Sequence, residues 1–194
     1  MKTTKIDIFN KQVSFFPRFS CKEPTKTVSV AEMVLNQNFK DEVEAYRYKN
    51  NTKRFLPCFT PSGVFSARNA NSLIQHNSII CIDIDKDDNL ELEDFSDLKD
   101  LIRQIPYVAY CGHSCGGEGY FLLIPIKYPE KHKAHFQALF EDFERCDIKI
   151  DRSCSDVCRL RCVSFDDEPY INEDVEVYTR LEEEIEYVKK KAMT

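Results

Sequence analysis

A pair of aspartates, Asp83 and Asp85, lies inside the apolar run of residues 78–85. Such a run predicts a buried strand, in which side chains two positions apart point the same way, about 6–7 Å from each other. Ile82 and Ile84 would then face a core, while both carboxylates converge on the other side. Because neighbouring anions repel each other, a divalent cation between them would stabilise the arrangement. The pair therefore indicates a metal site.

A third carboxylate, Asp151, ends the segment Ile-Lys-Ile-Asp at 148–151, which predicts a second strand. Three carboxylates around one or two Mg²⁺ or Mn²⁺ ions are the parts of a two-metal phosphoryl-transfer site. Two other interpretations stay open. The aspartates can be hydrated residues at a strand end, or a calcium loop can begin at Asp83, although Asp88 stands where such a loop needs glycine.

Three glycines, Gly116, Gly117 and Gly119, follow His113 and Ser114 between two apolar segments. Glycines leave backbone N–H groups exposed, so phosphate oxygens can approach them closely. The segment precedes strand-like sequence and not a helix, which excludes a Walker A loop and a Rossmann fingerprint. The alternative is a tight β-hairpin turn, which needs glycine for positive φ.

Two arginines, Arg159 and Arg161, alternate in a short apolar segment eight and ten residues after Asp151. In a strand both guanidiniums face one side, where they can clamp a triphosphate. The alternative is a pair of surface arginines that bridge neighbouring acidic residues.

The charge is distributed unevenly along the chain. The 194 residues include 27 Lys and Arg and 33 Asp and Glu, a net charge of −6. Residues 1–80 carry 12 basic and 6 acidic side chains, a net of +6, whereas residues 81–194 carry 15 and 27, a net of −12. This division predicts that a polyanion binds mainly to the first part. The acidic second part either holds metal ions or forms a solvated surface.

The nine cysteines are odd in number and form no Cys-x-x-Cys pair, and no signal peptide is evident. We therefore expect buried, reduced thiols in a cytoplasmic protein. Cys154, Cys158 and Cys162 have a spacing that would stack them on one helix face, so zinc is the alternative, although zinc sites usually use closer pairs. No apolar run approaches the roughly 18 residues of a membrane span.

Short strands and amphipathic helices must position these residues. Helices are expected after the Ser29 capping box, over 39–49, from a Ser96 cap to 102, over 130–145 and over 180–191. Strands are expected within 6–16, 56–65, 78–85, 107–111, 120–126, 148–151 and 160–165. The mixture predicts an α+β fold with a mixed or antiparallel central sheet flanked by helices.

The absence of internal repeats and of Gly/Ser linkers predicts a single domain over residues 1–194. Within it we distinguish a basic subregion at 1–50, a core that carries the motifs at 51–175, and a C-terminal helix at 176–194. The charged end of that helix is typical of a connection to a further domain.

Taken in order, these motifs resemble the archaeo-eukaryotic primase superfamily of polymerase-type catalytic domains. That superfamily shows a hydrophobic strand with Asp-x-Asp, a small-residue hairpin motif that usually ends in His, and a hydrophobic strand ending in Asp. Within it the sequence is similar to the VirE N-terminal-domain family of primase–helicase proteins from Bacteroidetes-type mobile elements. The phrases that carry the similarity lie between about residues 50 and 175, at 56–65, 79–85, 116–126 and 151–166.

The resemblance implies a primase-polymerase-like fold and a template-dependent nucleotidyltransferase, a DNA primase or polymerase. It would act on single-stranded DNA with NTPs or dNTPs, alongside a helicase domain in cis or in trans. Asp83, Asp85 and Asp151 would hold two divalent ions, Mg²⁺ or Mn²⁺. The nucleotide phosphates would contact Ser114, the backbone of 116–119, Arg159, Arg161 and Lys53.

The sequence departs from the family pattern at the histidine of the hairpin motif. Glu118, Gly119 and Tyr120 stand where that histidine is expected, and His113, on the other side of the turn, is the candidate substitute. Two alternatives therefore accompany the polymerase interpretation. One is a catalytically reduced module that binds nucleic acid or docks within a replication protein, and the other is a two-metal phosphodiesterase or nuclease that uses the same carboxylates.

Overall fold

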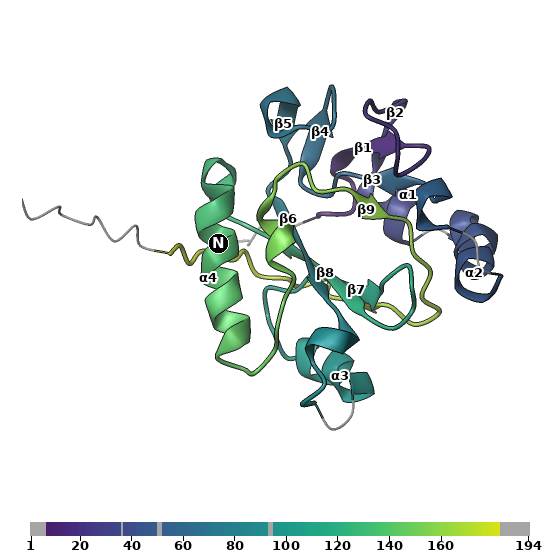
Figure 1. Cartoon of the computed structure of the whole chain (residues 1–194). Helices are drawn as coiled ribbons and strands as arrows, with labels where there is room; N and C mark the ends of the chain where they lie inside the picture. Colours follow the sequence, from purple (N-terminus) through teal and green to yellow (C-terminus); the bar gives the residue numbers. More distant parts are fainter. Residues whose placement is uncertain (1–6, 36, 50–51, 93–94, 183–194) are drawn as a thin grey trace, which may run out of the picture.

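The computed structural model describes residues 7–35, 37–49, 52–92 and 95–182. Figure 1 shows two four-stranded sheets, a separate hairpin and four α-helices around them. The strands are β1 (Gln12–Phe16), β2 (Lys26–Ser29), β3 (Cys58–Phe59), β4 (Gly63–Phe65), β5 (Leu73–His76), β6 (Ile79–Ile84), β7 (Tyr110–His113), β8 (Tyr120–Pro125), β9 (Arg161–Cys162) and β10 (Tyr170–Ile171). The helices are α1 (Val30–Val34), α2 (Lys40–Tyr48), α3 (Leu98–Ile102) and α4 (His132–Glu144).

The sheets have the strand orders β2-β1-β3-β9 and β10-β7-β8-β6, and the hairpin pairs β4 with β5. Every pairing between these strands is antiparallel, and an isolated parallel bridge joins Ile126 to Tyr178. This arrangement confirms the α+β class and the antiparallel form of the sheet.

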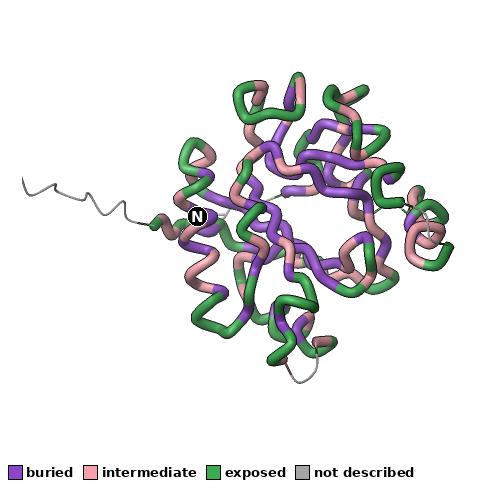
Figure 2. Tube along the Cα trace, in the orientation of Figure 1, coloured by how far each residue is buried: buried purple, intermediate pink, exposed green. Residues whose placement is uncertain are grey.

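The two faces of β6 belong to two different cores. Ile80, Ile82 and Ile84 pack with apolar residues of β8, α3 and α4, whereas Ile79 and Cys81 pack with residues of β1, β3, α1 and α2. Six residue pairs, from Ile79–Pro125 to Ile84–Tyr120, hold β6 against β8. The strand β6 is therefore covered on both faces, and Figure 2 shows most of β6 and β8 as buried.

Most of the expected elements form close to their predicted positions. The Ser29 capping box opens α1, and α2, β6, β8 and α4 lie within one to three residues of the expected bounds. The Ser96 cap is wrong: a 3-10 turn at Phe95–Asp97 leads into α3, so Asp97 is the N-cap residue. Its φ of −68° and ψ of −18° are already helical, and its side chain makes no capping hydrogen bond.

Four other expectations require correction. Residues 148–151 do not form a strand, because Asp151 already caps the 3-10 turn Arg152–Ser155. The strand expected over 160–165 consists of β9 alone, and the first strand begins only at Gln12. Residues 180–182 are not helical, and the rest of the expected C-terminal helix lies outside the described residues.

The strands β2, β5 and β10 were not expected, because they are short and lack a clear apolar alternation. All nine cysteines are free, and seven are buried, as the cysteine pattern predicted. Among the helices of the described residues, none combines the length and apolar character required to cross a bilayer.

Candidate functional site

The acidic centre of the molecule lies on the face of β6 that carries its odd-numbered residues. Ile79 and Cys81 on this face are buried in the second core, and the next two odd positions are Asp83 and Asp85. Because side chains alternate along a strand, the face changes from apolar to acidic at the point where β6 leaves the core. Ile82 and Ile84 lie in the other core, as predicted, and Asp83 and Asp85 both line the pocket described next.

A pocket of about 500 Å³ opens over these carboxylates, between the two sheets. Eight of the residues expected in a functional site line it: Lys53, Asp83, Asp85, Ser114, Gly116, Gly119, Arg159 and Arg161. They come from four separate parts of the chain, so the tertiary structure brings together motifs that the sequence keeps far apart.

Arg161 on β9 crosses from its own sheet to the carboxylate sheet. Its guanidinium forms an ion pair with Asp83 and lies 4.0 Å from the ring centroid of Phe121 on β8. The side chains of Arg161 and Asp83 are only 7% and 16% exposed, so both charges are largely removed from water. A buried ion pair of this kind depends on both partners, since either charge alone would be costly to bury.

Asp151 reaches the same centre from the loop after α4. Its backbone N–H donates to Asp83 O over 2.9 Å, which places the two aspartates side by side. Arg159 contacts both carboxylates, with Nη2 at 2.7 Å from Asp151 Oδ2 and 3.8 Å from Asp83 Oδ2. Burial disfavours ionisation of Asp151, but hydrogen bonds from Ser153 and the charge of Arg159 outweigh it and lower the Asp151 pKa.

The residues of this centre partly fit the expected metal site. Asp83, Asp151 and Cys154 offer ligand atoms that all lie within 4.8 Å of one another. Cys154 was not expected here, and burial raises its thiol pKa, so the carboxylates are the suitable ligands for a hard divalent ion. Asp85 lies outside this group but is electrostatically coupled to it, because burial and the charges of Asp151 and Asp88 raise its pKa.

The glycine-rich segment is the turn of the β7–β8 hairpin, as the alternative interpretation predicted. Ser114 N donates to Gly119 O over 2.7 Å, and Gly117 has a φ of +86°, which favours glycine. A Cβ atom on Gly119 would lie 2.7 Å from Ile84 O and 3.2 Å from Asp85 Oδ1. The missing side chain therefore allows the turn to pack directly against the end of β6.

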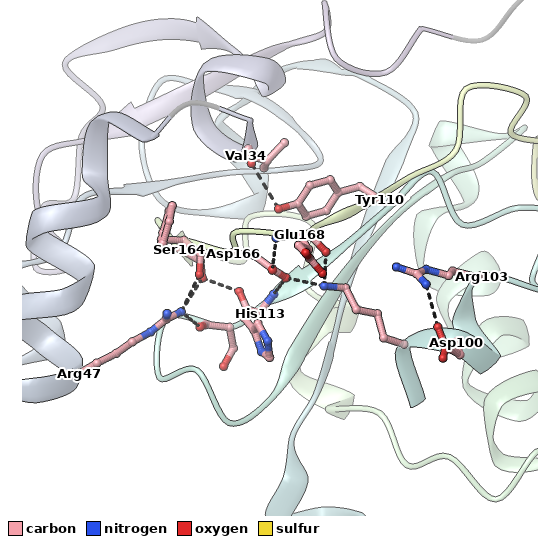
Figure 3. Close-up of polar contacts among 12 residues, drawn as sticks. Val34, Arg47, Asp100, Arg103, Tyr110, His113, Ser164, Asp166 and Glu168 are labelled. Atoms are coloured by element: carbon pink, nitrogen blue, oxygen red, sulfur yellow. Dashed lines mark hydrogen bonds and ion pairs between the residues drawn. The ribbon is translucent and has the colours of Figure 1, made fainter. Parts of the chain in front are cut away.

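Arg47 on α2 is a positioning residue that the sequence analysis missed. It donates to Ser114 O over 2.9 Å, to Cys115 O over 3.0 Å and to Phe165 O over 2.9 Å. Figure 3 shows it reaching from its helix toward Ser164 and the neighbouring backbone. A lone arginine in an amphipathic helix carries no sequence signal for this role, because its three acceptors are backbone carbonyls of distant segments.

The structure does not bring His113 and Gly117 into the pocket. Both line a neighbouring cavity on the other side of the turn, where the His113 ring stacks on Tyr120 at 4.9 Å. His113 N donates to Asp166, which forms a 2.9 Å ion pair with Lys99, as Figure 3 illustrates in part. Burial lowers the His113 pKa, which favours the neutral ring.

The two other metal interpretations lack the required geometry. Cys154 lies in a 3-10 turn and Cys162 on β9, so the cysteines expected to stack on one helix do not share a helix. A strand and not a helix precedes the acidic loop after Asp85, and Asn89 at its end donates to Asp85 O and Lys149 O. Asp94, the last ligand position of a calcium loop, lies outside the described residues.

Comparison with known proteins identifies one family. The family described as BT4734-like, N-terminal domain, matches residues 51–171, more than half of the chain and nearly the range that carries the motifs. No curated protein and no solved structure matches the chain. The matched range contains Asp83, Asp85, Asp151, the glycine-rich turn and the two arginines. The chain belongs to the BT4734-like N-terminal domain family.

Proposed function

We propose that this pocket is the active site of a divalent-metal-dependent nucleotidyltransferase, a DNA primase or polymerase of the archaeo-eukaryotic primase superfamily. The observation that carries the proposal is the meeting of two chemistries in one pocket. Asp83 and Asp85 line the same pocket as Lys53, Arg159 and Arg161, and the glycine-rich turn closes one side. A nucleoside triphosphate together with its metal ions requires both kinds of group.

The carboxylates Asp83 and Asp151 are the residues that would hold a metal ion, with Asp85 beside them. The raised pKa of Asp85 reflects burial and repulsion from Asp151 and Asp88, which a divalent cation would relieve. When bound, Mg²⁺ or Mn²⁺ supplies Lewis-acid activation of an attacking 3′-hydroxyl and stabilises the leaving pyrophosphate.

The cations of the pocket neutralise the phosphates of the incoming nucleotide. Arg159 is 38% exposed and bridges Asp151 and Asp83, so it can turn toward a phosphate when another cation compensates these carboxylates. Lys53 is exposed and lines the same pocket. Arg161 is buried, and we assign it the role of pairing with Asp83 and orienting it.

The hairpin turn positions the phosphates by its backbone. Gly116 is exposed, and together with Ser114 and Gly119 it faces the pocket, where N–H groups are close to any bound anion. Arg47 holds the carbonyl groups of Ser114 and Cys115, so the turn is presented in one conformation. Preorganised donors of this type stabilise developing negative charge.

Dinucleotide synthesis and primer extension on single-stranded DNA, with NTPs or dNTPs and Mn²⁺ or Mg²⁺, test the proposal. We expect the wild type to form phosphodiester products and Asp83→Asn and Asp85→Asn to lose them by at least about 100-fold. Asp87→Asn is the matched control, because Asp87 lines the same pocket from the 3-10 turn Lys86–Asp88, outside the Asp83–Asp151–Cys154 group, and its charge is not among those that raise the Asp85 pKa. It should retain activity.

The same experiment separates the two alternatives. Cleavage of the DNA, abolished by the same two substitutions, would make the protein a two-metal nuclease. Binding of DNA without synthesis or cleavage would make it a nucleic-acid-binding or docking module. Equal loss of activity in Asp87→Asn would also refute the assignment of the site, because it would show a general effect of acidic residues in the pocket.

A further inference from the structure

Three loops beside the pocket, residues 17–25, 52–57 and 66–72, are joined to one another by backbone contacts. Phe19 N donates to Leu56 O over 3.1 Å, and Arg68 N donates to Lys22 O over 2.8 Å. The Arg68 side chain adds a hydrogen bond to Phe19 O over 3.0 Å. The loops therefore form one continuous surface and not three independent segments.

This surface is strongly basic. Its loops contain five cations and one carboxylate, Glu23, and the cations, Arg18, Lys22, Lys53, Arg54 and Arg68, are all exposed. We name these five residues, with Phe19 and Phe55, the basic rim. Phe19, Lys53 and Arg68 also line the pocket, so the rim leads directly into it.

Aromatic rings alternate with the cations of the basic rim. The Phe55 ring is 55% exposed, and the guanidiniums of Arg18 and Arg54 lie 5.8 and 5.7 Å from its centroid. The Arg68 guanidinium lies 4.6 Å from the Phe19 ring centroid. An exposed ring between cations can stack an unpaired base while the cations contact the phosphates on either side.

We infer that the basic rim binds single-stranded nucleic acid through base stacking on Phe55 and phosphate contacts to Arg18, Arg54 and Arg68. The inference rests on the proposed function in one respect, that the bound strand would be the template that enters the pocket. A single strand fits better than a duplex, because the bases of a duplex are stacked on each other and leave no face for Phe55. Arg18, Phe19 and Lys22 precede the range matched by the family, so the rim extends beyond it.

Fluorescence anisotropy with a labelled oligothymidine of about 20 nucleotides, in the absence of metal and nucleotide, tests this inference. We expect Phe55→Ala to weaken binding about tenfold, the effect of losing one stacked base, and Phe55→Trp to restore it. The double variant Arg18→Ala/Arg54→Ala should reduce the slope of log K against log salt by about 1.4, which corresponds to two fewer phosphate contacts on a single strand.

The chain offers a matched control at Tyr128. The ammonium groups of Lys127 and Lys131 lie 5.2 and 5.9 Å from its ring centroid. None of these three residues lines the pocket. Tyr128→Ala and Lys127→Ala/Lys131→Ala should therefore leave affinity and salt slope unchanged. Circular dichroism and thermal melting of each variant exclude unfolding as the cause of any loss.

Equal effects at Phe55 and Tyr128 would overturn the inference, because they would show a nonspecific response to surface charge. An unchanged affinity of Phe55→Ala would also overturn it, as would tighter binding of a hairpin duplex than of the single strand. A chain that binds through the rim but transfers no nucleotide would refute the proposed function alone. If the wild type transfers nucleotides and the rim variants still bind the single strand normally, the inference about the basic rim would be refuted and the proposed function would stand.

Discussion

The sheet β10-β7-β8-β6 contributes Asp83 and the start of the acidic loop to the pocket, whereas the sheet β2-β1-β3-β9 contributes Arg161 from its last strand. The two sheets also differ in construction. Six residue pairs join β6 to β8, but only two join β9 to β3. The carboxylates are therefore held by an extensive ladder, while the arginine depends on its contacts with the other sheet.

The pairing of β9 with β3 changes how the uneven charge along the chain is distributed around the pocket. Arg159 and Arg161 belong to the acidic part of the sequence, residues 81–194, but β9 pairs with β3 and joins the sheet built from the basic part. A polyanion in the pocket would thus meet cations from both parts of the sequence. Binding of a polyanion mainly to the first part stays a prediction, which the test of the basic rim addresses.

The largest change in stability is expected from a substitution that removes the ion pair between the two sheets. Arg161→Met should lower the free energy of unfolding by about 3–5 kcal/mol, because it removes the buried partner of the Asp83 carboxylate and leaves only the 3.8 Å contact with Arg159. Arg159→Met is the control, since its side chain is 38% exposed and its loss should cost about 1 kcal/mol or less. Urea denaturation measures both.

The double variant Asp83→Leu/Arg161→Met sharpens this prediction. Replacing both charges by apolar side chains removes the unpaired carboxylate, so it should recover most of the stability lost in Arg161→Met. Equal stability of the single and double variants would show that the ion pair does not join the sheets energetically.

The next effect concerns the turn that the carboxylate sheet presents to the pocket. Arg47→Ala should lower the free energy of unfolding by about 1.5–3 kcal/mol, because the carbonyls of Ser114, Cys115 and Phe165 lose a charged donor. Hydrogen exchange at the Gly117 amide, which donates to Ser114 O within the turn, should become faster. Unchanged exchange would contradict the positioning role.

A smaller effect is expected where the turn packs against β6. Gly119→Ala should cost about 1–2 kcal/mol, because the new methyl group would meet Ile84 O at 2.7 Å. At Gly116 the nearest atom to an added Cβ is Ser114 Oγ at 4.0 Å, so Gly116→Ala should change stability by about 0.5 kcal/mol or less. Thermal melting of both variants measures the two changes in stability. Equal shifts of the melting temperature would contradict the prediction.

The last effect, which vanishes at neutral pH, lies outside both four-stranded sheets, at the histidine pair His76 and His132. Their nitrogens are 3.0 Å apart, and burial lowers their pKa values to about 4 and about 3. The unfolded chain therefore binds protons below pH 6.5 while the folded pair stays neutral, so stability decreases as the pH falls from 6.5 toward 4.

Unfolding measurements between pH 6.5 and about 5, where most carboxylates stay ionised, isolate this effect. The double variant His76→Phe/His132→Leu should lose the part of the pH dependence that belongs to the pair. A pH dependence identical to that of the parent would assign the acid sensitivity to other groups, such as the pocket carboxylates.

Local signals in the sequence predicted the elements that depend on neighbouring residues. The Ser29 capping box, the apolar run of β6 and the helical spacing of α4 each reflect interactions within a few residues, and each element forms. The segment 148–151 was predicted incorrectly as a strand, because its apolar alternation is the same whether or not a partner strand is present. It packs in the same core as β6, but one backbone hydrogen bond joins the two segments, from Asp151 N to Asp83 O.

The residues of the candidate site, like the elements of the fold, were predicted in part. The sequence alone identified eight of the residues that line the pocket, because carboxylates, arginines and glycines at these spacings are chemically distinctive. It did not identify Arg47 or Cys154, whose roles follow from contacts over large sequence separations. It also placed His113 beside the nucleotide, whereas the hairpin directs that side chain to the neighbouring cavity.

The sequence by itself determined which chemical groups the protein carries and the local order in which they occur. Only the tertiary structure decided that Arg161 pairs with Asp83 and that Arg159 bridges Asp83 and Asp151. The physical reason is that periodicity and capping act over a few residues, whereas the pairing of β9 with β3 and the packing of two sheets on a shared core act over the whole chain.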